Sequence, residues 1–260
     1  KMIVNLKDTF NNVVTMYDAA RPTYPLELLN DIKDFAEKSF FTRGLEIGAG
    51  TGQATDLFIK VINDLDIVEV GDKQVDYLME KYKSENVNTY KAYFEDFKSN
   101  KKYDLIFSAT AFHWVDATVG YPKVWDMLND SGVLAVFWHM SSVTLHDTGI
   151  FVGLNEIKKK YLPEESLGFD KEGIEGVRQK RISQIQSGNY FGIPVIKEYR
   201  WIDTYDADRY SLLLESYSST QTLDEEHKKL YLSEVRDYIN SNGGVVEMPQ
   251  HVMLYLVKKE

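Results

Sequence analysis

The sequence predicts an α/β fold in which a parallel sheet is covered by helices on both faces. Three observations predict it. Short apolar runs typical of buried strands alternate with helical segments through the first half of the chain. A glycine-rich turn follows the first of these runs, within Leu45–Gly52, at the kind of position where open α/β sheets bind ligands. The 260 residues are 43% hydrophobic, which is enough for a sizeable core.

Each element follows from the spacing of its apolar residues. After Pro25, which suits the first turn of a helix, Leu26, Leu29, Ile32 and Phe35 recur at the helical period. The strands expected in the first half are 44–48, 66–70, 87–94, 103–109 and 132–138, and the helices between them are 51–61, 72–82 and 121–129.

The alternation stops after Trp138. The next segment is polar and highly charged, and we expect a helical insertion, at about 140–190, that caps the edge of the sheet where ligands bind. Beyond it we expect a strand over 195–205, a helix over 224–240 and a strand over 251–259. The sheet then continues to residue 259, so the sequence predicts a single domain over 1–260.

Composition excludes several classes of function. The formal charge is −10, and an acidic surface repels nucleic acid. Without cysteine, a thiolate nucleophile or a Cys-ligated zinc is impossible. His139 and His146 lack a third histidine nearby, so we expect no metal. No apolar run reaches the roughly 18 residues of a membrane span, and the first residues lack a signal-peptide pattern. We therefore expect a cytoplasmic protein without membrane or nucleic-acid partners.

The glycine-rich turn distinguishes between kinds of nucleotide site. Dinucleotide-binding proteins place a small residue three positions after the second glycine of the motif. Counted from Gly48, that position is Gln53, which disfavours a nicotinamide cofactor. No Gly-Lys-Ser/Thr follows, so the phosphate-binding P-loop pattern also fails. What remains is Glu46 followed by glycines at 48, 50 and 52, and this resembles the first motif of the class I S-adenosylmethionine-dependent methyltransferases.

Two further segments fit that resemblance. Glu69 ends the second strand, where an acid can accept hydrogen bonds from both ribose hydroxyls; nicotinamide enzymes share this feature. In "AYFEDF" (92–97), the resemblance implies that Glu95 or Asp96 accepts from the adenine amino group and that Phe94 packs on the ring.

The segment "YDLIFSATAFHWVD" (103–116) narrows the resemblance to the small-molecule branch that includes trans-aconitate methyltransferase. "YDAARPTYP" (17–25) and "YSLLLESYSSTQTL" (210–223) match the same branch. The resemblance implies a Rossmann-like seven-stranded methyltransferase sheet that is mostly parallel with an antiparallel C-terminal strand. It also implies an N-terminal lid over about 1–25.

The resemblance assigns the candidate site residues. Those expected to bind S-adenosylmethionine are Tyr17, Arg21, Glu46, Gly48, Ala49, Gly50, Glu69, Val70, Phe94, Glu95 and Ser108. Those expected to bind the substrate are Tyr24, Trp114 and Tyr217. His113 is the catalytic candidate, with three open readings: a general base, a donor that positions substrate or cofactor, or a residue that holds its loop.

The sequence thus favours methyl transfer from S-adenosylmethionine to a small-molecule acceptor, for example a carboxylic acid, by in-line displacement. A carboxylate acceptor would need no general base. Two alternatives stay open: a non-catalytic nucleoside-binding protein of the same fold and, less favoured, a nicotinamide-dependent oxidoreductase.

Overall fold

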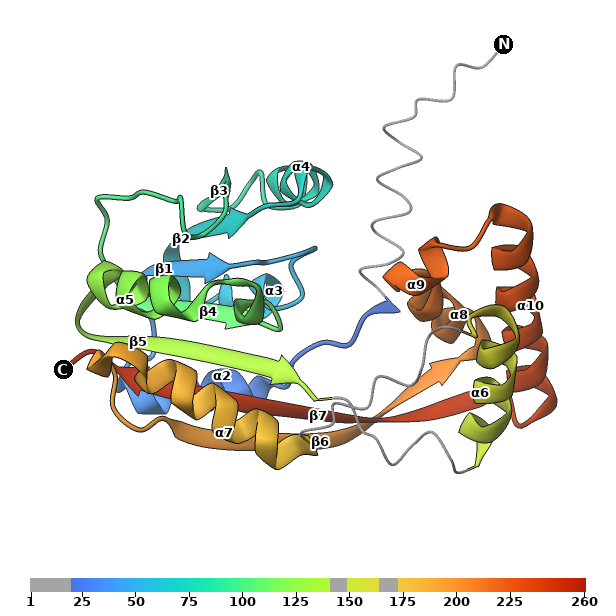
Figure 1. The fold of residues 1–260 in the computed structure, drawn as a ribbon. Helices are drawn as coiled ribbons and strands as arrows, with labels where there is room; N and C mark the ends of the chain where they lie inside the picture. The colour runs from blue at the N-terminus through green and yellow to red at the C-terminus, as the bar shows by residue number, and fades with distance from the viewer. Residues whose placement is uncertain (1–19, 141–148, 164–172) are drawn as a thin grey trace, which may run out of the picture. The chain divides into compact units, whose positions relative to one another are not determined.

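The computed structural model describes residues 20–140, 149–163 and 173–260 (Figure 1). Tyr17 and most of the predicted N-terminal lid, about 1–25, lie outside the described residues. Seven strands form one sheet in the order β3-β2-β1-β4-β5-β7-β6. They are β1 (Phe41–Ile47), β2 (Ile62–Glu69), β3 (Val87–Lys91), β4 (Tyr103–Ala109), β5 (Leu128–His139), β6 (Val195–Asp206) and β7 (Val245–Lys258).

The strands pair as the alternation predicts. β1 lies parallel to β2 and β4, β2 to β3, and β4 to β5. β7 runs antiparallel to β5, with Val133 opposite Lys258 and His139 opposite Val252. The predicted seven-stranded sheet, mostly parallel with an antiparallel C-terminal strand, is confirmed.

The chain divides into two compact units. The first, the sheet unit, holds Thr23–Met140, Ile174–Tyr199 and Val252–Glu260. The second, the helical unit, has as its described residues 20–22, 149–163, 173 and 200–251.

The segment predicted as a cap, about 140–190, is divided between these two units. α6 (Ile150–Tyr161) buries Leu154 and Ile157 in the core of the helical unit. α7 (Gly173–Gln186) belongs, from Ile174 onward, to the sheet unit, because it buries Ile185 in the core of the sheet.

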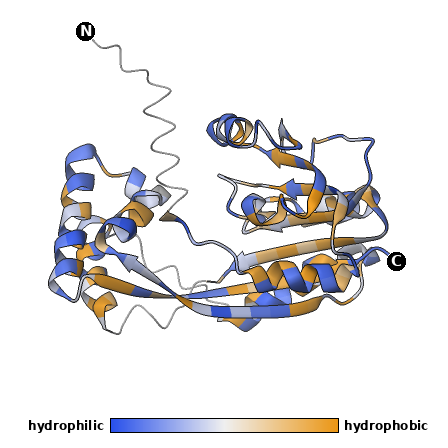
Figure 2. Ribbon diagram, turned by 180° about the vertical axis from the view of Figure 1, so that it is seen from behind, coloured by the Kyte–Doolittle hydropathy of each residue, from blue (hydrophilic) through white to orange (hydrophobic). Residues whose placement is uncertain are grey.

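Helices cover the sheet unit on both faces. They are α2 (Leu26–Ala36), α3 (Thr55–Phe58), α4 (Asp72–Lys81), α5 (Ala117–Met127), α7 and two short 3₁₀ segments, η1 (Phe112–Trp114) and η3 (Ser187–Asn189). On one face, Tyr121 of α5 and Ile185 of α7 pack with the strand residues Val136 and Tyr255. α3 packs differently: the Phe58 ring stacks on that of Phe107, with centroids 4.1 Å apart. Figure 2 shows the hydrophobic residues concentrated in the strands between these helices.

The first crossover differs from the sequence-based expectation. A helix was predicted over 51–61, but α3 spans only Thr55–Phe58. Gly50 and Gly52 both have positive φ, so the chain turns before it becomes helical. β2 also begins earlier than the predicted 66–70, because Ile62 pairs with Phe41 at the start of β1.

The helical unit has its own apolar core. α8 (Ala207–Glu215), α9 (Ser218–Gln221) and α10 (Glu225–Ser241) follow β6, and α10 packs on α6 and α8. Gly153 of α6 permits the contact with α10, since a Cβ there would lie 2.2 Å from Tyr238 Cζ. The Asp224 carboxylate accepts from the backbone N–H of His227 and caps α10, which confirms the helix predicted over 224–240.

Within 20–140, 149–163 and 173–260, none of the helices has the length and apolar character needed to cross a bilayer.

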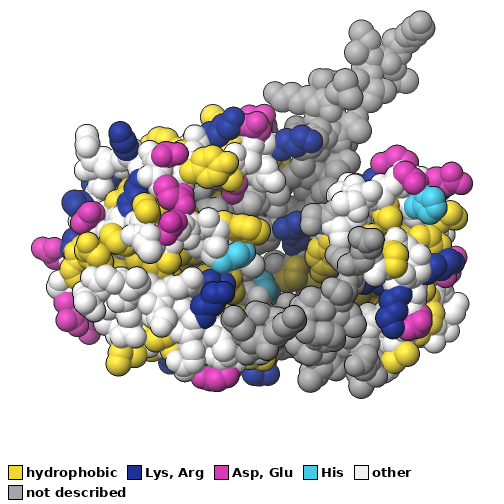
Figure 3. Space-filling model, in the orientation of Figure 1, with side chains coloured by type: hydrophobic (Ala, Val, Ile, Leu, Met, Phe, Trp, Pro, Cys, Tyr) yellow, Lys and Arg dark blue, Asp and Glu magenta, His cyan; other side chains and the backbone are white. Residues whose placement is uncertain are grey.

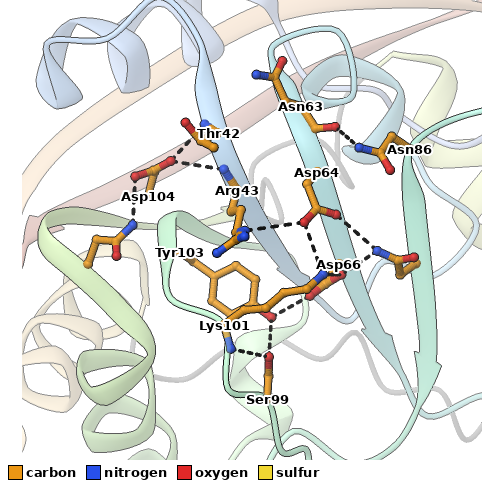
Figure 4. A network of polar contacts seen from close by, with 12 residues as sticks. Thr42, Arg43, Asn63, Asp64, Asp66, Asn86, Ser99, Lys101, Tyr103 and Asp104 are labelled. Atoms are coloured by element: carbon orange, nitrogen blue, oxygen red, sulfur yellow. Dashed lines mark hydrogen bonds and ion pairs between the residues drawn. The ribbon is translucent and has the colours of Figure 1, made fainter.

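Toward the amino ends of β1 and β4, a polar network links the strands (Figure 4). Asp66 is its centre and is only 1% exposed. Its carboxylate accepts from Tyr103 Oη at 2.7 Å, Lys101 Nζ at 2.9 Å and Asn88 Nδ2 at 2.9 Å. A buried carboxylate is tolerated only when its oxygens are hydrogen-bonded, so this set of donors fixes β2 against β3 and β4.

Asp104 makes a second link at the same end of the sheet. It accepts from the backbone N–H groups of Thr42 and Arg43, at 2.9 and 3.1 Å, and from Lys38 and Asn129. Partial burial opposes ionisation, but the hydrogen bonds from Arg43, Asn129 and Lys38 outweigh it and lower the pKa of Asp104. The carboxylate thereby fixes the start of β4 to the start of β1.

Replacing Asp66 with Asn should lower the free energy of unfolding by about 1–3 kcal/mol, because Lys101 and Tyr103 lose a charged acceptor. Urea unfolding measures the change. Asp64→Asn is the matched control on the same strand. Its side chain is 26% exposed, so we expect a loss of about 1 kcal/mol or less. Equal losses in the two variants would contradict the central role of Asp66.

Candidate functional site

The carboxyl ends of the parallel strands meet at one edge of the sheet unit. Two hydrogen bonds hold this edge: Gly48 N–H donates to Val68 O at 2.8 Å, and Thr110 N–H donates to Phe137 O at 2.7 Å. The loops after β1, β2 and β4 therefore begin next to one another. Open α/β sheets bind ligands at this edge.

The loop after β1 depends on its glycines. Gly48, Gly50 and Gly52 have φ of 71°, 60° and 95°, in the left-handed region that favours glycine. A Cβ on Gly48 would lie 2.6 Å from the Cβ of Ala111, in the loop after β4. On Gly50, a Cβ would meet no atom closer than Gln53 Oε1 at 3.9 Å. The backbone at Gly50 is thus bare toward open space, where a ligand can approach it.

Glu69 joins two of these loops. Its Oε2 accepts from Gly50 N–H at 2.9 Å, and its Oε1 accepts from the backbone N–H groups of Val70 and Gly71, both at 2.9 Å. The side chain is 8% exposed. The predicted ribose acid therefore lies at the carboxyl end of β2, in contact with the glycine loop.

Glu46 is the most buried group of the site. It is 0% exposed, and its Oε2 accepts from Thr55 Oγ1 at 2.6 Å. Within the part of the chain that the structure describes, Oε1 is buried and has no hydrogen-bond partner. Burial raises the pKa of Glu46 to about 8, and the nearby carboxylates of Asp56 and Glu69 act in the same direction.

The back of the glycine loop is braced by residues that the sequence analysis missed. Tyr82 Oη donates to Gly52 O at 3.2 Å and to Asp56 Oδ1 at 2.7 Å. Lys81 Nζ donates to Thr51 O at 3.1 Å and to the other oxygen of Asp56 at 2.8 Å. Tyr82 and Lys81 end the helix that follows β2, so only the fold brings them to the loop.

The loop after β3 holds Phe94 and Glu95. Phe94 is buried, and its ring lies 6.2 Å from that of Phe112. Glu95 Oε1 accepts from the backbone N–H of Asp116 at 3.0 Å. Both residues connect this loop to the one after β4. Their contact with adenine remains a prediction.

Ser108, another predicted cofactor residue, is fully buried near the end of β4. Its hydroxyl donates to Ile47 O at 2.7 Å, the last carbonyl of β1. The side chain ties the two strand ends together. Its role toward the cofactor remains a prediction, as does that of the buried Ala49, which lies between Gly48 and Gly50 of the glycine loop.

His113 lies in η1, just beyond β4. Its Nδ1 accepts from Trp138 Nε1 at 3.1 Å. Burial, followed by the positive charge of Arg181, lowers the pKa of His113. Trp114, a predicted substrate residue, is 82% exposed, and its ring lies 4.8 Å from that of His113. In Figure 3 a histidine side chain lies beside basic side chains on the face that carries α5 and α7.

Tyr24, the other predicted substrate residue of the sheet unit, reaches the end of β4. Its Oη lies 2.9 Å from Thr110 Oγ1, and its ring meets that of Phe137 edge-on at 4.8 Å. Thr110 has a φ of 53° and also accepts from the backbone N–H of His139 at 3.2 Å. Burial lowers the pKa of His139 to about 4. Thr110 is not among the site residues predicted from the sequence.

Two predicted residues belong to the helical unit. Arg21 donates from Nη2 to Ser216 O at 3.3 Å. Tyr217 follows Ser216 and is 44% exposed. Tyr17 lies outside the described residues. The roles of all three remain predictions. Across the described ranges, no group of three or more histidine, aspartate or glutamate side chains could hold a metal ion.

Gly48→Ala should destabilise the protein by about 2 kcal/mol or more, because the left-handed φ and the approach of Ala111 both oppose a side chain. The matched control is Gly192→Ala, where φ is not in that region and a Cβ would meet nothing within 4 Å. Urea unfolding of both variants checks this, and equal midpoints would contradict the constraint on Gly48.

Glu46 should lower the free energy of unfolding as pH rises from about 4.5 to about 8, and the fall should be a net one above about 6.5, because the lowered pKa of His139 contributes an opposite slope below that value. Its folded-state pKa lies above the ordinary 4.5, so the folded protein binds more protons in this window. The stability present below that window is lost as pH rises through about 8, by up to about 1.4 kcal/mol per pH unit. Glu46→Gln should remove this slope. Urea unfolding at several pH values measures both proteins, and parallel curves would count against a protonated Glu46.

Comparison with known proteins agrees with this geometry. A family model described as a methyltransferase domain matches residues 45–136. An uncharacterized methyltransferase-like protein of Schizosaccharomyces pombe is 29% identical over 146 residues, 55% of this chain and 55% of that protein. A probable S-adenosylmethionine-dependent methyltransferase of Saccharomyces cerevisiae is 29% identical over 131 residues, 47% and 43% of the two chains. The chain thus matches about half the length of these relatives.

The fold has solved counterparts. A putative type II methyltransferase from Anaeromyxobacter dehalogenans aligns with a TM-score of 0.61 and 17% identity, over 92% of this chain and 96% of that one. The family model, which matches residues 45–136, covers the glycine loop, Glu69 and the loop after β4. Residues 45–136 of this chain therefore match a methyltransferase domain, and the whole chain shares its fold with a solved methyltransferase structure.

Proposed function

We propose that the protein transfers a methyl group from S-adenosylmethionine to a small-molecule acceptor, with a carboxylic acid as the favoured class. One observation carries the proposal. The fully buried Glu46, with Oε1 unpartnered among the described residues, stands directly before a loop whose backbone is bare at Gly50.

The residues present fit this cofactor. A buried carboxylate oxygen without a donor is costly, and an ammonium group would supply one as a charge-assisted hydrogen bond. Glu46 would therefore hold the amino-acid part of S-adenosylmethionine, and Glu69 the ribose hydroxyls. The bare backbone at Gly50 allows close approach, and Gln53 occupies the position where a dinucleotide motif requires a small residue.

When bound, the cofactor would supply an electrophilic methyl group on a sulfonium; the leaving group would be a neutral thioether, which no acid needs to protonate. The protein's contribution is alignment. Holding acceptor and methyl in line can lower the barrier by ~7–11 kcal/mol. A carboxylate acceptor is already ionised near neutral pH, so the protein need not remove a proton from it.

Positive charge beside the loop after β4 supports an acidic acceptor. The Arg181 guanidinium of α7 lies 4.2 Å from the centroid of the Trp138 ring. Its positive charge contributes to the lowered pKa of His113. Arginine recognises carboxylates through paired N–H groups. The resemblance of "AFHWVD" to the trans-aconitate branch points to the same acceptor class.

Calorimetric titration of the whole protein tests the cofactor. We expect binding of S-adenosylmethionine and S-adenosylhomocysteine, and none of NAD. Glu69→Gln should weaken binding by roughly 10- to 100-fold, because hydrogen bonds to a charged acceptor are lost. Glu85→Gln, an exposed change in the same unit, is the control and should leave affinity unchanged. Tighter binding of NAD than of S-adenosylmethionine would favour the oxidoreductase reading.

An assay for S-adenosylhomocysteine tests turnover and the acceptor class. A panel of di- and tricarboxylic acids, amines and phenols should yield product with the acids. Product with amines or phenols alone would overturn the acceptor class. Cofactor binding without product from any panel member or cell extract would favour the non-catalytic nucleoside-binding reading.

A further inference from the structure

We infer that Trp138 is a positioning residue that holds His113 as the neutral Nε2–H tautomer, so that His113 donates a hydrogen bond to the methyl acceptor and does not act as a base. This inference rests on the proposed function for the identity of the acceptor. The hold of Trp138 on His113 rests on the geometry of the sheet unit alone.

The direction of the hydrogen bond is fixed by chemistry. A tryptophan Nε1–H can only donate, so at 3.1 Å it requires a lone pair on His113 Nδ1. A neutral imidazole has one N–H and one lone pair. With the lone pair used at Nδ1, the proton must be on Nε2. His113 can then donate from Nε2, whereas accepting a proton would require the contact with Trp138 to break.

Trp138 is itself held in place. It is 5% exposed, in β5, and its ring packs edge-on against that of Tyr255 of β7 at 5.7 Å. The Arg181 guanidinium of α7 lies over it at 4.2 Å. Because β5, β7 and α7 together hold the Trp138 ring, the direction of its Nε1–H is fixed. The fold therefore sets the orientation of His113.

The charges around His113 favour the neutral ring. Partial loss of hydration lowers the pKa of His113, and the positive charge of Arg181 of α7 acts in the same direction. Arg178, on the same helix, pairs with Glu198 of β6. Tyr121 of α5 and Tyr255 of β7 have pKa values raised by burial, so both remain uncharged near neutral pH.

This arrangement selects acceptors by their lone pairs. An Nε2–H donor fits an acceptor that presents an oxygen lone pair and needs no deprotonation, which describes a carboxylate. The nearby positive charge of Arg181 favours the same group. An ammonium or a protonated phenol would need a base, and His113 in this state does not provide one.

NMR of the ¹⁵N-labelled whole protein tests the tautomer without reference to activity. We expect His113 to be protonated at Nε2 in the wild type. Trp138→Phe should raise the pKa of His113, since a hydrogen bond to the neutral ring is lost. Trp125→Phe, a change of another tryptophan in the sheet unit, is the control and should leave that pKa unchanged. An Nδ1–H tautomer in the wild type would overturn the inference.

Kinetics test the role as a donor. His113→Gln keeps an N–H near the position of Nε2, whereas His113→Phe removes it. We expect kcat/KM to fall roughly 10- to 100-fold in His113→Phe and to be largely restored in His113→Gln. Equal losses in both variants would overturn the donor role. A protein with the Nε2–H tautomer that binds no S-adenosylmethionine would reject the proposed function while leaving the hold of Trp138 on His113 intact.

Discussion

Glu69 accepts hydrogen bonds from three backbone N–H groups that belong to two different loops. This carboxylate sets the distance between the end of β2 and the glycine loop after β1. The loop can take its left-handed conformations only because glycine occupies the turning positions, and Glu69 then fixes the one conformation that the sheet requires. Tyr82 and Lys81 brace the same loop from behind. The candidate cofactor site is therefore built mainly from backbone, and its shape depends on a small number of anchoring side chains.

Two buried acids on neighbouring strands of the sheet unit act in opposite ways. In β2, Asp66 has a donor for each of its oxygens and stabilises the strands. At the carboxyl ends, Glu46 is equally buried, but its pKa is raised to about 8. Asp66 therefore contributes to stability, whereas the ionised form of Glu46 lowers it. Such a cost at a ligand-binding edge is typical of a site arranged to receive a positively charged group.

Much of the fold could be predicted from the sequence, because strong periodicity marks the central strands and α10. The motif residues Glu46 and Glu69 could also be placed, since each lies at or next to the end of a strand. Tyr82, Thr110 and Trp138 could not. Tertiary packing brings these residues to the site, and no local sequence pattern predicts their position there. The predicted cap shows the same difficulty: charge indicated helices over about 140–190, but only packing shows that α7 belongs with the sheet.

The position of β7 has a consequence for how the sheet is assembled. This strand lies between β5 and β6, although both precede it in the chain. During synthesis on the ribosome, the edge of β5 that pairs with β7 therefore stays unpaired until more than a hundred further residues have been made, since His139 pairs with Val252. Such long-range closure slows folding and leaves an apolar, aggregation-prone edge exposed in the nascent chain. Newly made molecules are thus expected to need protection by chaperones until the last strand is inserted.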